Sequence, residues 1–123
     1  MEQKTNEIEI NGVTYVPKNS VAQMASTVDG MEYCMVRTYS AGVFAGYVES
    51  RNGKEVVLRN ARRMWRWAGA ASLSQLATDG TSSPGECRFP VAVDKVTLTE
   101  AIEIIQITEK AKASIDGVPV WSK

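Results

Sequence analysis

Short apolar runs separated by turn residues dominate the middle of the chain and predict an antiparallel meander. The runs at 32–39, 43–49 and 55–58 are rich in Val, Tyr, Phe and other residues that favour strands. Ser40-Ala41-Gly42 breaks the first run, and Arg51-Asn52-Gly53-Lys54 is typical of a hairpin turn. We therefore expect consecutive strands that pair with their neighbours in sequence.

The N-terminal residues carry a separate hairpin signal. Asn11-Gly12 lies between short apolar runs in the segment 8–16, and both residues tolerate the positive φ of a tight hairpin turn. Pro17 stops the second strand because it has no backbone N–H. The segment Val21–Thr27 predicts a short helix with Ser20 as its N-cap.

The segment 59–67 is ambiguous between strand and helix, and we favour a strand. Alternation then groups Arg62, Met64 and Arg66 on one face, and Arg63, Trp65 and Trp67 on the other. Residues 72–77 predict one or two helical turns. Ser72 and Gln75 have the spacing of a capping box, and Gly80 ends the turns.

The C-terminal third mixes strand and helix signals. Residues 87–93 and 96–99 predict strands, while 101–108 favours a strand for its isoleucines but also supports a helix. Residues 109–115 predict a helix stopped by Gly117, and we expect Val120 and Trp121 to dock on a neighbouring surface. Together these signals predict one α+β domain over 1–123 with a mainly antiparallel sheet. Within it we expect a hairpin and linker at 1–30, antiparallel strands at 31–67, and helical turns with further strands and a helix at 68–123.

Charge is balanced overall but uneven along the chain. The 14 basic and 14 acidic residues give zero net charge, yet residues 37–66 hold seven basic and two acidic groups, a net of +5. The flanks are acidic, at −3 for 1–36 and −2 for 67–123. An anionic ligand is therefore expected in the centre, whereas the overall balance argues against a generic nucleic-acid binder.

Several classes of chemistry are disfavoured by composition. The chain has no histidine, which removes the commonest general base and zinc ligand, and its two cysteines are too few for a Cys-only zinc site. Glu100 and Glu103 have no accompanying carboxylate cluster, so neither catalytic nor metal-binding residues are predicted, and no cofactor. No apolar run is long enough to span a membrane, and the polar N-terminus does not read as a secretory signal.

The segment 59–67, RNARRMWRW, carries the densest chemical signal. Guanidinium groups grip phosphate oxygens in pairs, and indole offers a face on which a nucleobase stacks. Core packing of the tryptophans, with the arginines solvated or paired with them, is the alternative. The segment, its expected neighbour strand and the following helix start give the candidate ligand-binding residues: Arg37, Tyr39, Arg59, Asn60, Arg62, Arg63, Trp65, Trp67 and Ser72.

Four stretches resemble one known family. VRTYSAGVFAGYV at 36–48, GKEVVLRNARRMWRWAGAASLSQLA at 53–77, CRFPVAV at 87–93 and EIIQITEKAKASIDGVPVW at 103–121 are similar to the phage Thoeris anti-defence sponges of the first type. The resemblance covers about residues 33–121, and the arginine–tryptophan run passing into GAASLSQLA is its most specific part.

The resemblance implies a function without catalysis. Such sponges bind glycocyclic ADP-ribose, the signal made by bacterial TIR enzymes, and hold it uncleaved in the cytoplasm of the infected host. It also implies a homodimer or higher homo-oligomer with ligand pockets between subunits, and cyclic oligonucleotides as a second ligand class in some members. No membrane partner is expected, because no apolar run is long enough to span a membrane. A nucleic-acid-binding module and a structural or assembly module of a phage stay open as alternatives.

Overall fold

The computed structural model describes residues 8–10, 13–15 and 23–123. Strands β1 (Ile8–Ile10) and β2 (Val13–Tyr15) form an antiparallel hairpin in which Ile10 is paired with Val13. The predicted N-terminal hairpin is therefore present, while its turn residues Asn11 and Gly12 lie outside the described residues.

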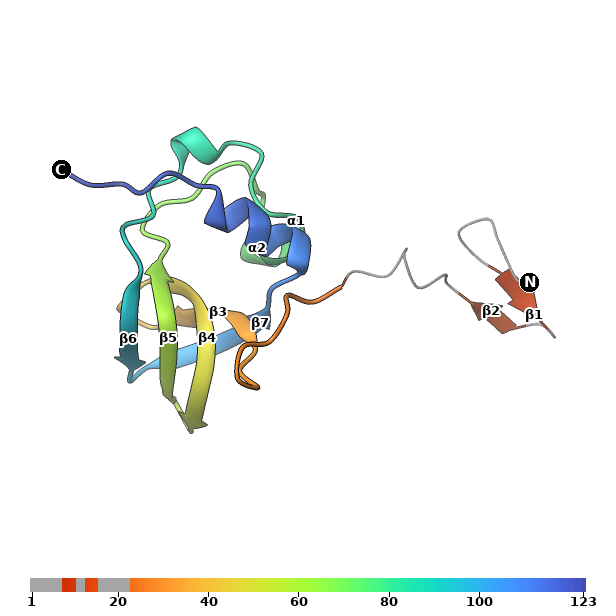
Figure 1. The fold of residues 1–123 in the computed structure, drawn as a ribbon, viewed down its shortest axis with the longest axis horizontal. Coiled ribbons are helices and arrows are strands. Elements are labelled where there is room, and N and C mark those ends of the chain that lie inside the picture. The colour runs from red at the N-terminus through yellow and green to blue at the C-terminus, as the bar shows by residue number, and fades with distance from the viewer. Residues whose placement is uncertain (1–7, 11–12, 16–22) are drawn as a thin grey trace.

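The main sheet is antiparallel and has five strands in the order β6-β5-β4-β3-β7. They are β3 (Tyr33–Thr38), β4 (Val43–Asn52), β5 (Glu55–Arg63), β6 (Val93–Leu98) and β7 (Ala101–Gln106). Two helices, α1 (Leu73–Asp79) and α2 (Glu109–Asp116), pack against each other over this sheet (Figure 1). The chain is thus an α+β protein with a mainly antiparallel sheet, as the sequence predicts.

Both faces of the sheet are buried. Adjacent strand residues point to opposite faces, so Met35 packs under the helices while Val36 packs on the other side. The helix-side core includes Leu76, Phe89 and Ile115. The second core lies on the opposite face of the sheet and consists of Val36, Phe44, Val56, Leu58, Ala61 and Leu98.

Sheet curvature encloses the second core. The register shifts between Ala45 and Tyr47 and again between Val48 and Ser50, and such bulges bend a strand and increase its twist. The Ala101 N–H then donates to the Lys54 carbonyl at 2.9 Å, which brings the start of β7 to the tip of the β4–β5 hairpin. The sheet is therefore a half-open barrel whose interior is the second core.

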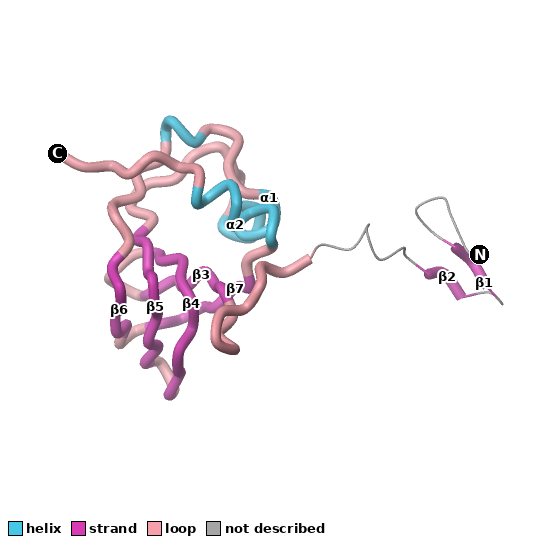
Figure 2. Tube along the Cα trace, in the orientation of Figure 1, coloured by secondary structure: helices cyan, strands magenta, loops and turns pink. Residues whose placement is uncertain are grey.

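Loops gather at the helical end of the molecule (Figure 2). They join β5 to α1 and α1 to β6, and they include the short 3-10 helix η2 (Pro84–Glu86). Two isolated bridges tie them together, Arg66 with Arg88 and Phe89 with Val120. The C-terminal tail packs here on its own chain: the Trp121 N–H donates to the Phe89 carbonyl at 3.0 Å, while Val120 stays 56% exposed.

Two predicted elements are wrong and one is too long. Residues 23–27 are not helical: Met24 bridges Thr108, and the Ala25 N–H donates to the Ile107 carbonyl, so these backbone groups are satisfied by a distant segment. Residues 87–92 form only isolated bridges rather than a strand. The strand expected over 59–67 ends at Arg63, where the chain leaves β4 for the loop region.

Three other expectations are confirmed. Ser72 caps α1, since its hydroxyl oxygen accepts the Gln75 N–H at 3.1 Å, and Gly80 is the C-cap. The ambiguous segment 101–108 is a strand over Ala101–Gln106. The last helix begins after Thr108 and ends before Gly117.

Gly69 is essential to the loop that precedes α1. Its φ is +81°, and a Cβ at this position would lie 2.5 Å from the backbone nitrogen of Ser83. We expect Gly69→Ala to lower the free energy of unfolding by at least about 1–3 kcal/mol, because the energetic cost of the strained backbone and that of the close contact add together. Urea denaturation measures the change. Gly85→Ala is the matched control, since Gly85 has open space around it; equal stability of the two variants would contradict the prediction.

Candidate functional site

Arg62 is a structural residue of the helix-side core. Only 8% of it is exposed, and its guanidinium donates four hydrogen bonds to backbone carbonyls. Burial lowers the pKa of its guanidinium from the usual value. Because its guanidinium N–H groups donate to carbonyls inside the fold, Arg62 is not available to a ligand. The four acceptors belong to Phe89, Pro90, Ile115 and Val118, so this side chain ties β5 to the loop before β6 and to the end of α2.

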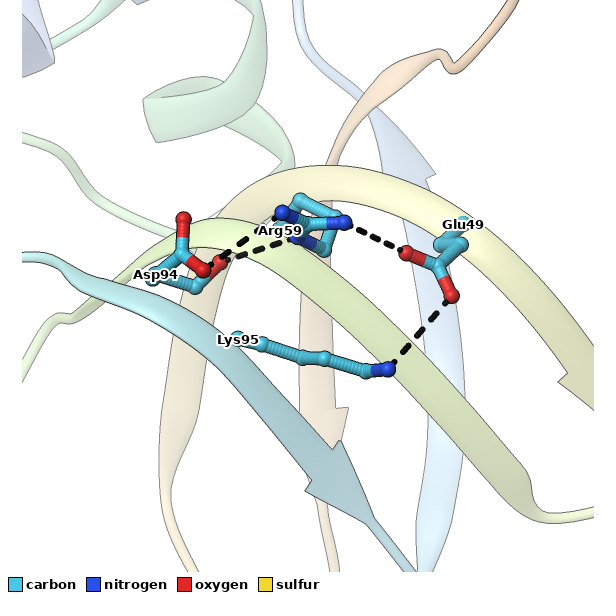
Figure 3. A network of polar contacts seen from close by, with 4 residues as sticks. All are labelled: Glu49, Arg59, Asp94 and Lys95. Carbon is cyan, nitrogen blue, oxygen red and sulfur yellow. Dashed lines mark hydrogen bonds and ion pairs between the residues drawn. The ribbon is translucent and has the colours of Figure 1, made fainter.

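Arg59 is partly exposed and is neutralised by carboxylates. Its guanidinium lies 3.0 Å from Glu49 and 3.4 Å from Asp94, and Lys95 reaches Glu49 at 3.8 Å (Figure 3). The hydrogen bond from Arg59 lowers the pKa of the Glu49 carboxyl. This network crosses β4, β5 and β6, and we assign Arg59 to bracing the strands.

Arg37 has an ion-pair partner in the fold, and Asn60 has a backbone role. Arg37 forms an ion pair with Glu103 of β7 at 2.8 Å. Asn60 has a φ of +51°, a conformation that Asn adopts more readily than most residues, and it sits where β5 bulges opposite Gly46. A Cβ at Gly46 would lie 3.1 Å from the Ala61 Cα, so the glycine permits β4 and β5 to approach closely at this point.

Ser72 and Trp67 are also placed by the fold. The hydroxyl of Ser72 serves as the N-cap of α1. Trp67 is partly buried and packs against the helix-side core. We therefore treat both as supports of the loop region rather than as ligand contacts.

Arg63 differs from its neighbours because it is exposed and points away from the helix-side core. Its guanidinium carbon lies 4.5 Å from the centroid of the Phe44 ring, and it donates to the Ala41 carbonyl at 3.0 Å. Ala41 belongs to the loop that also carries Tyr39, whose side chain is 78% exposed. No carboxylate of residues 23–123 lies within ion-pair distance of Arg63.

A cavity of about 440 Å³ opens beside Arg63, where the second core reaches the surface. Two cations, Arg63 and Lys95, are the charged groups of its wall, and the rest is apolar. We call it the barrel-mouth cavity; it is lined by Phe44, Ala61, Arg63, Pro90, Val91, Val93, Lys95 and Val96. Its size suits a small organic ligand, and its lining suits one that combines an apolar ring with negative charge.

A tryptophan pair lies next along the chain. Trp65 is 58% exposed, and its ring stacks on Trp121 with centroids 4.9 Å apart and planes 9° apart. The Arg88 guanidinium carbon lies 5.5 Å from the Trp121 ring. One face of Trp65 is thus covered by Trp121, and its exposed surface is left for another planar group.

The pair and the cavity belong to one surface. Met64, between Arg63 and Trp65, is buried in the helix-side core, whereas Arg63 and Trp65 are both exposed, so their side chains lie on the side away from that core. Phe89 accepts the hydrogen bond from Trp121, and the next residues, Pro90 and Val91, line the cavity. We call this surface the Arg63–Trp65 face; it comprises the barrel-mouth cavity with Trp65, Trp121 and Arg88, and with Arg66, which bridges Arg88.

Of the nine residues predicted as ligand contacts, Arg63 and Trp65 lie on this face, and Tyr39 is on the loop that contacts Arg63. The structure adds residues that the sequence does not indicate, namely Phe44, Arg88, Val91, Lys95 and Trp121 as members of the same face. The long-range Arg66–Arg88 bridge brings Arg88 here, and no local pattern predicts that pairing.

Other reactive groups do not gather into a site. Within the described ranges, no three His, Cys, Asp or Glu residues are placed to hold a metal ion. Cys34 and Cys87 are both buried free thiols, and burial raises the pKa of Cys34 to about 11. None of the described helices is long and apolar enough to cross a membrane.

Comparison with known proteins gives one match. Residues 31–115 match the family described as a domain of unknown function (DUF6948). This range includes the five-stranded sheet and α1, and all but the last residue of α2. No curated protein and no solved structure matches the chain.

Proposed function

We propose that this chain, which belongs to the family described as a domain of unknown function (DUF6948), is a phage anti-defence sponge. It binds a cyclic ADP-ribose isomer made by bacterial TIR enzymes, glycocyclic ADP-ribose, and holds it uncleaved in the cytoplasm of the infected host. The Thoeris effector is then deprived of its signal. The similarity of residues 33–121 to the sponge family motivates the ligand, and the Arg63–Trp65 face supplies a surface with matching chemistry.

The observation that carries the proposal is positive charge without a counterion beside an apolar cavity. No carboxylate in residues 23–123 pairs with Arg63, Arg66 or Arg88, whereas Arg37 and Arg59 are both neutralised. A pyrophosphate would accept charge-assisted hydrogen bonds from the unpaired guanidinium groups. The adenine would use either the barrel-mouth cavity or the open surface of Trp65.

Sequestration suits this face better than cleavage. Hydrolysis of a ribosyl or phosphoryl bond generally requires a positioned acid or base, and the chain has no histidine. The carboxylates nearest Lys95, Glu49 and Asp94, are engaged by Arg59 (Figure 3). The groups that face the cavity are cations and apolar side chains, which bind an anion without attacking it.

Recovery of the ligand tests the proposal. The protein is mixed with a slight deficit of glycocyclic ADP-ribose, free ligand is removed by filtration, and the retained fraction is heat-denatured and analysed by mass spectrometry. We expect no ligand in the filtrate, and intact ligand to be released when the retained protein is heated. A hydrolysed product would indicate an enzyme, and ligand that passes the filter at micromolar protein would refute the sponge.

Single-stranded nucleic acid is the competing ligand, because an exposed tryptophan among arginines also forms a stacking platform. The two ligands differ in their dependence on salt. Binding to a polynucleotide weakens steeply with salt since many counterions are released. A gel shift with an oligonucleotide at low salt, combined with no retention of the cyclic nucleotide, would favour this alternative.

A further inference from the structure

The two edges of the main sheet are protected to different extents. Edge strand β6 carries adjacent charges, Asp94 and Lys95, and the Asp94 carbonyl accepts a hydrogen bond from Arg59 at 3.2 Å (Figure 3). Edge strand β7 exposes Ile102 and Ile104, which are 46% and 36% accessible. Its one charged residue, Glu103, is ion-paired with Arg37. On β6, Val93 is 47% accessible, but the side chains of Asp94 and Lys95 beside it are 90% and 53% exposed. Solvated charges on an edge strand discourage strand addition, and apolar edges invite it.

Backbone groups on the outer side of β7 lack strand partners in the described chain. β7 pairs with β3 alone, and the Ile107 N–H donates to the Tyr33 carbonyl. By alternation, the backbone groups of Ile104 and Gln106 point outward. Beyond Gln106 the edge is already covered, because Ala25 donates to the Ile107 carbonyl and Met24 bridges Thr108. The open edge therefore spans residues 102–106.

We propose that β7 pairs antiparallel with β7 of a second copy, about a two-fold axis at Ile104, so that the two sheets join into one. This register uses the whole open edge. It places Ile104 against Ile104 and Glu103 opposite Ile105, so no carboxylate faces its copy. Each Glu103 is already paired with Arg37 of its own chain at 2.8 Å.

The surroundings of β7 fit this occupant. A cavity of about 430 Å³ lies between the β4–β5 hairpin tip and β7, and its wall includes Arg51, Lys54, Ile102 and Ile104. It leaves open space beside Ile102 and Ile104 on the outer side of β7. Because β6 is guarded by charge, pairing of β7 with β6 of another copy is disfavoured, and the β7–β7 contact closes after two chains. This inference is independent of the proposed ligand.

Sedimentation velocity tests the contact. We expect the wild-type protein at about 50 µM to sediment as a species of at least twice the chain mass of 13.5 kDa. Ile104→Lys should at least halve that mass, because it places two like charges at the axis. Thr97→Lys, on the exposed part of β6, is the matched control and should leave the mass unchanged. A monomeric wild type, or an Ile104→Lys variant of unchanged mass, would overturn the proposal.

Oxidative cross-linking tests the register without a charged substitution. Directly opposed residues in an antiparallel pair have Cα atoms about 4.5–5.5 Å apart, within disulfide range. Ile104→Cys should therefore form a covalent dimer under mild oxidation, whereas Thr97→Cys should not. The native thiols of Cys34 and Cys87 are buried and do not compete. Equal cross-linking of the two variants would exclude the Ile104 axis.

Discussion

Replacement of Arg62 by alanine is expected to lower the free energy of unfolding by about 3–5 kcal/mol, because it leaves buried carbonyls without donors. The Arg62 guanidinium satisfies four carbonyls, from Phe89, Pro90, Ile115 and Val118. A domain of ordinary stability has about 5–15 kcal/mol in total, so this loss brings the variant close to unfolding. Urea denaturation followed by tryptophan fluorescence measures the change.

The neighbouring arginine gives the control for this prediction. Arg63→Ala removes one exposed hydrogen bond to Ala41 and the contact with the Phe44 ring, so a loss of about 1 kcal/mol or less is expected. Arg62→Lys should rescue little, since an ammonium has three donors at a single point and cannot span the four acceptors. If Arg62→Ala and Arg63→Ala are equally stable, the structural role of Arg62 is refuted.

These two arginines also mark the limit of prediction from sequence. Alternation correctly separates Arg62 and Met64 from Arg63 and Trp65. It is wrong for Trp67, which packs against the helix-side core because the strand ends at Arg63. It does not indicate which side is buried more deeply, because the curled sheet has a core on each face. The bulge at Asn60 is likewise hidden, since it depends on the fit between β5 and Gly46 of β4.

Local patterns predict the elements, and distant contacts decide the site. The strands over 33–38 and 43–52 and the cap at Ser72 follow from turn residues and β-propensity nearby in the chain. The pairing of β3 with β7, and the bridge of Arg66 with Arg88, join segments far apart in sequence. The barrel-mouth cavity arises from such contacts, so neither its Phe44 floor nor Lys95 could be inferred from the dense segment 59–67.

Loss of the Arg63 side chain is expected to weaken binding of glycocyclic ADP-ribose by about 10- to 150-fold in Kd. A hydrogen bond from a charged donor contributes about 1.5–3 kcal/mol, and each 1.4 kcal/mol is a factor of ten. Arg63 has no counterion within residues 23–123 to compete with a pyrophosphate. Isothermal titration calorimetry of Arg63→Ala, after its fold is verified, gives the ratio of Kd values; Arg63→Glu should weaken binding further through repulsion.

Arg37→Ala is the informative control for that loss. Arg37 is an exposed arginine of the same sheet, but Glu103 neutralises it at 2.8 Å, so its removal should change the Kd by less than about threefold. Trp65→Ala separates the two places available to the adenine: a loss as large as that of Arg63→Ala favours stacking on Trp65, and a small one favours the barrel-mouth cavity. If Arg37→Ala weakens binding while Arg63→Ala does not, the ligand binds at the β3–β7 side and the Arg63–Trp65 face is not its site.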